Sequence, residues 1–180
     1  VLAQSSKNIN WENLTYGPQL GVGSHTGSST MVLLARAARE RMRTDKSLAV
    51  LSVDIAKAFP NISRRKVIEG HLELGQAHLA WEAQHRLALH TNTYLPWGGL
   101  RPVATGVQQG HPLSPHNFAA ANYLRQKQAF EMWDEDEPLE ALFNVNYADD
   151  NLFAGPLQDS LRYLHGLLTV EDEYGAKVSL

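Results

Sequence analysis

The sequence has no cysteine and no long apolar run, and each absence excludes a class of protein. Without cysteine, its 180 residues hold neither a disulfide framework nor cysteine-based zinc or redox chemistry. No apolar stretch approaches the roughly 20 residues that a helix needs to cross a bilayer. The chain starts at Val1 without a recognisable signal peptide and stops at Leu180 inside an apparent strand, so we expect an excised piece of a longer protein.

The composition is that of a folded domain with an uneven distribution of charge. Hydrophobic residues make up 43% and charged residues 19%, which is typical of a globular chain with a sizeable core. The net charge of −3 divides into +5 over residues 1–70 and −8 over residues 71–180. A basic first part could follow phosphates and an acidic second part could hold cations. Ordinary surface charge explains the same totals.

Hydrophobic periodicity and turn residues predict alternating helices and strands. The strongest strand is Leu48–Ile55, which is apolar almost throughout, as in a central strand. We expect helices over residues 30–43, 64–74, 76–90, 115–133 and 157–174, a hairpin over residues 91–111 with Gly98-Gly99 at its turn, and a last strand from Ala176. This order predicts an α+β fold of the split βαβ kind, an antiparallel sheet with helices on one face.

Serine residues are predicted to cap three of these helices. Ser28 or Ser29 would cap the first and Ser63 the second. Ser114 would cap the fourth, with Pro115 at its first helical position.

Three histidines, His71, His78 and His85, recur every seven residues along the second and third predicted helices. A zinc site on a helix would need a spacing of three or four together with a carboxylate. The spacing therefore favours a solvated helix face.

Two adjacent carboxylates, Asp149 and Asp150, stand between apolar runs near the end of the chain. Neighbouring side chains of a strand point to opposite faces, so both can face one ligand only at a tight turn between two short strands. Uncompensated buried charge is costly, and a hard divalent cation bound by oxygen is the natural compensation. A plain surface turn is the alternative, because Asp is common in turns.

Asp54 is a third carboxylate in an unusual place, near the C-terminal end of the apolar stretch 48–55. It could simply cap the turn that follows. The end of a central strand is also where ligands are usually held, which favours a ligand site at this position.

Three stretches, in this order, resemble the palm of reverse transcriptases. Residues 52–59 (Ser-Val-Asp-Ile-Ala-Lys-Ala-Phe) are similar to the family's first catalytic motif, residues 106–115 (Gly-Val-Gln-Gln-Gly-His-Pro-Leu-Ser-Pro) to its second, and residues 147–150 (Tyr-Ala-Asp-Asp) to its third. Residues 19–30 are similar to the fingers segment of non-LTR retrotransposon and group II intron enzymes. The resemblance implies a partial fingers segment over residues 1–47 and a palm over residues 48–180, truncated before the thumb.

The resemblance implies an RNA-directed DNA polymerase, which adds deoxynucleotides to a primer 3′-hydroxyl on an RNA template with two Mg²⁺ ions, or Mn²⁺. Asp54 and Asp149 would be the chief metal ligands. Asp150 would be the third carboxylate, with a less direct role, and the backbone carbonyl of Ile55 would complete one ion's shell.

The resemblance also implies a nucleotide site. Phe59 would lie beneath the sugar and exclude a 2′-hydroxyl, although a core phenylalanine is the alternative. Ala58 would lie beside it, and Gln109 and Gly110 would lie against the incoming nucleotide, where glycine permits a close backbone approach.

The resemblance also implies nucleic-acid contacts, partners and a location. Template and primer contacts are expected from Arg39, Arg41, Arg64, Arg65, Ser114 and Pro115. The expected partners are an RNA template, a DNA primer, deoxynucleoside triphosphates and the thumb and other domains of the parent polyprotein, with no membrane. We expect an intracellular location, which would be nuclear for a eukaryotic retrotransposon and cytoplasmic for a bacterial element.

The sequence departs from the family pattern at several positions, including Pro60, where the family often has Asp, and Gln108, where Pro or Arg is usual. The loop over residues 23–27 lacks the arginines that the family usually carries there. The family lysine that protonates pyrophosphate would fall beyond Leu180, so we expect the 180 residues alone to be inactive.

Three other readings stay open. A decayed or domesticated palm would only bind nucleic acid or a protein partner. A viral-type RNA-dependent RNA polymerase would share the palm and metals, but Phe59 counts against it. A metal-dependent nuclease would use paired carboxylates without needing Phe59, Gln109 or Gly110.

Overall fold

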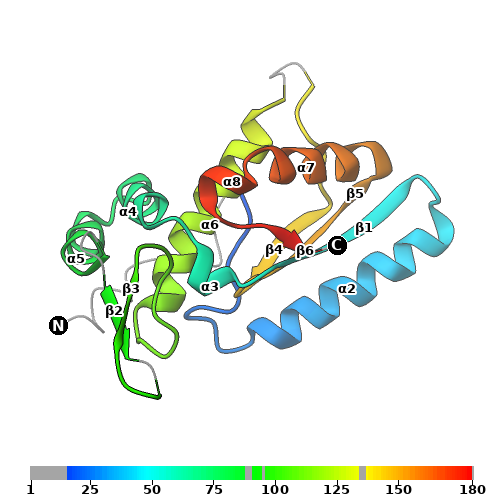
Figure 1. Cartoon of the computed structure of the whole chain (residues 1–180). Coiled ribbons are helices and arrows are strands. Elements are labelled where there is room, and N and C mark those ends of the chain that lie inside the picture. Colours follow the sequence, from blue (N-terminus) through cyan, green and yellow to red (C-terminus); the bar gives the residue numbers. More distant parts are fainter. Residues whose placement is uncertain (1–15, 88–90, 95, 134–136, 180) are drawn as a thin grey trace.

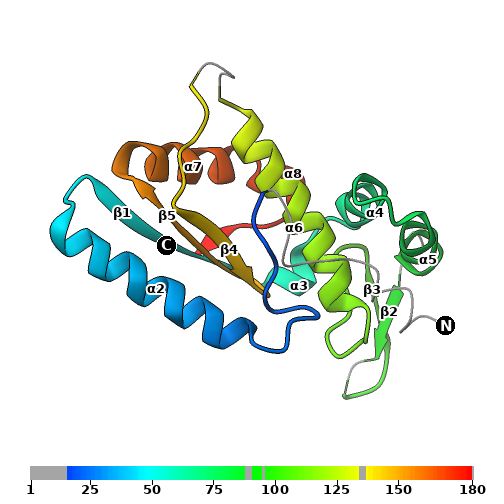
Figure 2. The same cartoon turned by 180° about the vertical axis from the view of Figure 1, so that it is seen from behind.

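The computed structural model describes residues 16–87, 91–94, 96–133 and 137–179. Figures 1 and 2 show the chain from opposite sides. None of the helices in the described ranges is long and apolar enough to cross a membrane.

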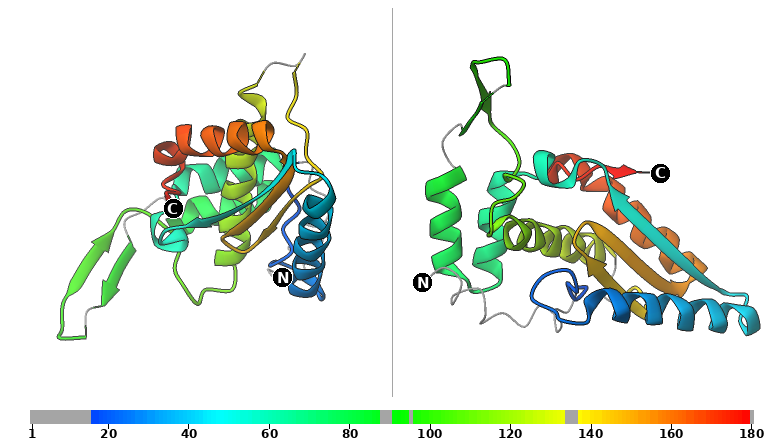
Figure 3. Two further views of the ribbon diagram at one scale, coloured as in Figure 1. Left: turned by 90° about the vertical axis from the view of Figure 1, so that its right-hand side faces the viewer. Right: turned by 90° about the horizontal axis from the view of Figure 1, so that it is seen from below.

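A four-stranded antiparallel sheet forms the centre of the fold, in the order β4-β5-β1-β6. Its strands are β1 (Leu48–Ile55), β4 (Phe143–Tyr147), β5 (Asp150–Pro156) and β6 (Val178–Ser179). The predicted strand 48–55 is confirmed, and it is the central strand between β5 and β6. A separate hairpin of β2 (Thr91–Tyr94) and β3 (Leu100–Val103) projects from the body (Figure 3). It confirms the hairpin predicted over residues 91–111, although its second strand already ends at Val103.

The long helices occupy the segments in which the periodicity predicted them, with residues 88–90 of the third predicted helix outside the described residues, whereas the short helix over Ala58–Asn61 was not predicted. The long helices are α2 (Gly27–Thr44), α4 (Arg64–Glu73), α5 (Ala77–Leu87), α6 (Ser114–Glu131) and α7 (Leu157–Thr169), and the short ones are α3 (Ala58–Asn61) and α8 (Glu171–Tyr174). The last predicted helix, over residues 157–174, is thus two helices, which meet at Val170.

The predicted caps are right in one case and wrong in two. Ser63 caps α4, because its hydroxyl accepts a hydrogen bond from the backbone N–H of Lys66 at 3.4 Å. The cap at Ser28 or Ser29 is wrong, since α2 already begins at Gly27. A Cβ at Gly27 would lie 1.9 Å from the carbonyl oxygen of Leu20, so only glycine lets the helix start this close to the preceding segment.

Ser114 is also not a cap. It is the first residue of α6, and its hydroxyl donates to the carbonyl of Gln108 at 2.6 Å. The serine therefore ties the preceding loop to the helix instead of capping it. Pro115 lies in the first turn, as predicted.

Helices cover both faces of the sheet, so the prediction of helices on one face is wrong. Met31 and Leu34 of α2 pack with Val145 and Leu152 on one face. Phe153, the residue after Leu152, points the other way and packs among buried side chains of α6 and α7. The views in Figure 3 show α2 and α7 on opposite sides of the sheet. An apolar stripe predicts that a helix packs on a sheet, but not on which face.

A second lobe, formed by α4 and α5, packs against α6 (Figure 1). His71 of α4 is fully buried there, with its ring nitrogens 2.7 Å from Gln76 Oε1 and 2.8 Å from Asn117 Oδ1. Burial lowers the pKa of His71. His78 and His85 are exposed, so the prediction of a solvated histidine face is wrong only for His71, whose position on α4 faces α6.

Candidate active site

The adjacent carboxylates lie at a tight hairpin turn, as the sequence predicted. Tyr147 at the end of β4 pairs with Asp150 at the start of β5, and only Ala148 and Asp149 lie between them. Ala148 has a φ of +53°, a left-handed conformation that non-glycine residues rarely adopt. This turn brings Asp149 and Asp150 to one end of the sheet.

Strand β1 brings Asp54 to the same end. The β1–β5 ladder runs antiparallel from Leu48–Pro156 to Val53–Asn151. Asp54 follows Val53 and Asp150 precedes Asn151, so both aspartates lie directly beyond the last pair of this ladder. Asp54 and Asp150 are exposed and Asp149 is half-buried, so the carboxylates face a solvent-accessible surface.

These carboxylates interact electrostatically. The pKa of Asp150 is raised, first by partial burial and then by the negative charges of Asp149 and Asp54. A divalent cation would relieve this repulsion, and carboxylate oxygens are the ligands that Mg²⁺ prefers. Among the residues that the structure describes, no three acidic, histidine or cysteine side chains stand close enough to hold a metal as they are. The carboxylates are the type of donor that suits Mg²⁺, but in the described residues they do not form a complete coordination shell.

The loop before α6 is joined to the segment after β1 by backbone hydrogen bonds. The N–H of Val107 donates to the carbonyl of Phe59 at 2.8 Å, and that of Gly106 donates to Ile62 at 2.9 Å. A Cβ at Gly106 would lie 2.1 Å from the carbonyl oxygen of Pro60, so the two segments touch. The first and second sequence motifs are thus one structural unit.

Phe59 lies at the edge of the core. Its ring stacks on Phe118 of α6, with centroids 5.2 Å apart and an interplanar angle of 27°. The side chain is half-buried, whereas Ala58 is buried. Phe59 therefore combines a core contact with a partly accessible ring, and both roles considered for it fit this position.

Gln109 and Gly110 are exposed. Gly110 has a φ of +83°, and a Cβ there would meet nothing within 4 Å. The space over this backbone is open to a ligand. Gln109 lines a cavity of about 530 Å³ whose walls include Pro60, Arg64, Arg86, Thr105 and His111.

The residues predicted to contact nucleic acid divide into two groups. Arg39 and Arg41 are exposed on α2, and Arg65 is exposed and paired with Glu69 at 2.6 Å. Arg64 is half-buried and donates to the carbonyls of Gly106 at 2.8 Å and Leu87 at 3.1 Å, so it holds the loop before α6. Ser114 is buried and Pro115 half-buried.

Sequence reasoning missed a set of buried amides behind the hairpin turn. Gln19 binds the backbone of Ala148, and Asn146 contacts Gln126 and the carbonyl of Gly17. Figure 2 shows the segment before α2 running beside β4. The sequence does carry a signal, since Asn144 and Asn146 alternate with Val145 and therefore lie on one face of a strand.

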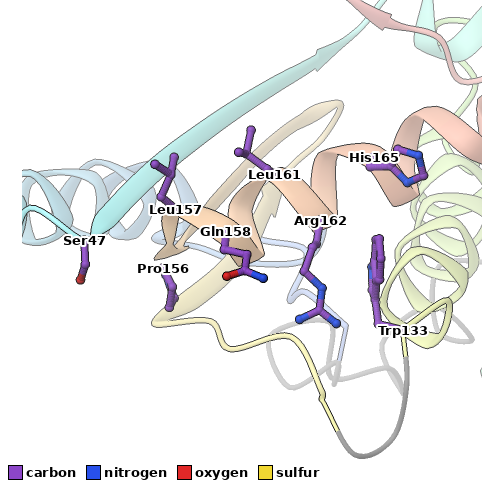
Figure 4. Close-up of a pocket in the computed structure, with 8 residues that line it drawn as sticks. All are labelled: Ser47, Trp133, Pro156, Leu157, Gln158, Leu161, Arg162 and His165. Carbon is purple, nitrogen blue, oxygen red and sulfur yellow. The ribbon is translucent and has the colours of Figure 1, made fainter.

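A shallow, largely apolar groove of about 710 Å³ lies away from the carboxylates (Figure 4). Its lining includes Pro156, the last residue of β5, and Leu157 and Leu161 of α7, whereas Asp150 is the first residue of β5. The guanidinium of Arg162 stacks over the ring of Trp133 at 4.7 Å in this groove. The groove is separated from the carboxylates by the length of a strand.

Comparisons with known proteins show a likeness in fold to solved structures. No family model and no curated protein matches the sequence. Solved telomerase structures match the fold. Apo telomerase from Candida tropicalis matches 99% of this chain with a TM-score of 0.64 and 12% identity, and telomerase from Candida albicans with a fragment of telomeric RNA matches 86% with a TM-score of 0.61 and 15% identity.

The chain is similar in fold to part of telomerase. It spans about a third of the length of those structures, 34% and 30% respectively. Telomerase is a reverse-transcriptase-related enzyme, and at these identities the likeness concerns the fold alone. The fold therefore agrees with the family that the sequence motifs resemble.

Proposed function

We propose that the chain is the palm and part of the fingers of an RNA-directed DNA polymerase. The observation that carries the proposal is the meeting of Asp54 with the Asp149-Asp150 turn at one end of the sheet. The order β4-β5-β1-β6, with helices connecting β1 to β4 and β5 to β6, supports a split βαβ palm over residues 48–180. Residues 1–47 belong to the fingers in this proposal, and the thumb lies outside the 180 residues.

The reaction joins a deoxynucleotide to a primer. The primer 3′-hydroxyl oxygen attacks the α-phosphorus, a P–O bond forms, the bond to pyrophosphate breaks, and the hydroxyl proton is released. Two Mg²⁺ ions, or Mn²⁺, supply charge stabilisation of the attacking and leaving oxygens when they are bound. Asp54, near the end of β1, and Asp149, in the turn between β4 and β5, would hold the metal ions together with the carbonyl of Ile55, and Asp150 would adjust the charge of the site.

The segment after β1 and the loop before α6, which backbone hydrogen bonds join, select the nucleotide. The half-buried Phe59 presents its ring beneath the sugar, next to Ala58, and excludes a 2′-hydroxyl. Gln109 and the open backbone at Gly110 lie against the incoming nucleotide. The Lys57-Ala58-Phe59 sequence supports an enzyme of the non-LTR retrotransposon or group II intron type over a retroviral one.

An RNA template is the proposed polymeric partner. The Candida albicans telomerase that matches the fold is in complex with an RNA fragment, which supports RNA as a ligand of this fold. The exposed Arg39, Arg41 and Arg65 are the proposed phosphate contacts, so binding should weaken with salt.

Primer extension tests the proposal. The intact parent protein is incubated with Mg²⁺, an RNA template, a DNA primer and deoxynucleotides, because the chain spans only about a third of the telomerases that it matches in fold. The wild type should extend the primer, and Asp149→Asn should abolish extension. Asp172→Asn is the matched control, an exposed aspartate on α8 outside the site, and it should extend normally. Normal synthesis by Asp149→Asn would refute the assignment.

The loop over residues 23–27, which lacks the arginines that the resembled family usually carries there, favours a second candidate, a palm that binds nucleic acid without catalysis. This candidate predicts salt-sensitive RNA binding by the intact protein with no extension under any divalent cation. RNA binding and extension measured on the same preparation separate the two functions.

A further inference from the structure

Gln19 holds the turn between β4 and β5 with its side-chain amide. Its Nε2 donates to the carbonyl of Ala148 at 3.0 Å, and its Oε1 accepts from the N–H of Ala148 at 2.8 Å. The same Oε1 accepts from the N–H of Gly21 at 2.9 Å. One side chain thus satisfies both backbone groups of a residue 129 positions away, and only 3% of Gln19 is exposed.

The backbone around Gln19 fixes where this amide lies. The N–H of Asn146 donates to Pro18 at 2.8 Å, and the N–H of Leu20 donates to Asn146 at 2.6 Å, which makes a short parallel bridge to β4. A Cβ at Gly21 would lie 2.3 Å from the nitrogen of Ala148, so the segment also touches the turn directly. Gln19 therefore approaches the turn from a rigid support.

The residue that Gln19 binds is the one with the unfavourable backbone. Ala148 has a Cβ and yet a φ of +53°. Such conformations persist only where the surroundings determine them, and they occur where a functional group must be aimed. The carboxylates of Asp149 and Asp150 follow directly, so the conformation of Ala148 decides where both point.

We propose that Gln19 is a positioning residue, which fixes the turn so that Asp149 and Asp150 face Asp54. This inference rests on the proposed function. Because Gln19 is buried and its amide is engaged by the turn, it acts through Ala148 and not through contact with template or nucleotide.

The first test follows the turn itself, without catalysis. Gln19→Met keeps the length of the side chain and loses all three hydrogen bonds. The backbone N–H of Ala148 should then exchange with deuterium about tenfold faster or more, because its partner is gone. Gln76→Met is the matched control, since Gln76 is also buried but binds His71 in the other lobe. It should leave exchange at Ala148 unchanged, and an unchanged rate in Gln19→Met would overturn the proposal.

The second test uses primer extension by the intact protein. Gln19→Met should lower kcat about tenfold or more while the KM for deoxynucleotides stays within about twofold, since misplaced carboxylates affect the transition state more than ground-state binding. A KM effect with unchanged kcat would overturn the positioning role. If the wild type itself does not extend primers, the proposed function fails, and the exchange result still shows whether Gln19 sets the turn.

Discussion

The backbone N–H of Val107 donates to the carbonyl of Phe59 at 2.8 Å. The two residues belong to sequence motifs separated by more than forty positions, and this bond makes them neighbours. The ring of Phe59 is held from the other side by Phe118 of α6. Phe59, which is proposed to lie beneath the sugar and exclude a 2′-hydroxyl, is therefore fixed both through its backbone and through its ring.

Phe59→Val should admit ribonucleotides. The smaller side chain opens the space under the sugar, and the loss of one steric contact corresponds to roughly 10–200-fold in specificity. The measurement is the ratio of kcat/KM for deoxynucleotides to that for ribonucleotides, in the intact protein. Discrimination equal to that of the wild type would assign Phe59 to the core alone.

Gly106→Ala and Gly110→Ala form a matched pair. Both glycines have a positive φ, +76° and +83°, so alanine is strained at either position. Only at Gly106 would the new Cβ also meet a backbone carbonyl, that of Pro60. We expect Gly106→Ala to lower the free energy of unfolding by about 2–4 kcal/mol and Gly110→Ala by about 1 kcal/mol. Urea denaturation measures both, and equal losses would contradict the close approach.

The tight turn at Asp149-Asp150 and the central strand that carries Asp54 near its end could be predicted from the sequence, because both follow from local patterns. The position of Gln19 against Ala148 could not, since it depends on a contact between residues 129 positions apart. The apolar stripe of α2 predicted that this helix packs against the sheet. The face it covers could not be predicted, because Leu152 and Phe153 of β5 are both apolar and point to opposite faces, Leu152 towards α2 and Phe153 towards α6 and α7.

The same limit applies to single polar residues. Ser114 looked like a helix cap, but its hydroxyl is taken by Gln108 in the folded loop. The spacing of His71, His78 and His85 predicted that all three lie on a solvated helix face. The packing of α4 on α6 buries His71 alone. The local sequence indicates which roles such a residue can have, and the contacts it makes in the folded chain determine which of them it has.

Ala148→Gly should not destabilise the chain. Glycine adopts the positive φ of this position without the steric cost of a Cβ, which offsets the entropy that glycine loses on folding. Ala37→Gly is the control, because Ala37 is exposed within α2 and glycine in a helix costs about 1 kcal/mol. Thermal or urea unfolding compares the two, and an equal loss at both positions would contradict the strained turn.

The stability of the fold should decrease as the pH falls below about 6.5, the ordinary pKa of histidine. Burial lowers the pKa of His71, so the unfolded chain binds a proton at a higher pH than the folded chain does. The contribution is complete above the unfolded pKa and is lost as the pH falls towards the folded one.

His111 and His116 have pKa values lowered in the same direction, so the test needs a variant at His71. His71→Gln should reduce the change in the free energy of unfolding between pH 7 and pH 5, as the principle of proton linkage requires. The measurement is urea denaturation at several pH values. A variant with the pH dependence of the wild type would show that His71 does not contribute.

Mn²⁺ binding tests most directly the claim that Asp54 and the Asp149-Asp150 turn form one cation site. Electron paramagnetic resonance of free Mn²⁺ should show binding by the intact protein that Asp54→Asn weakens about tenfold or more, as Asp149→Asn also does. Asp45→Asn, at the end of α2 and before the opposite end of β1, should bind as the wild type does. Unchanged affinity in Asp54→Asn together with a loss in Asp149→Asn would mean that β1 takes no part in the site, and it would contradict the account.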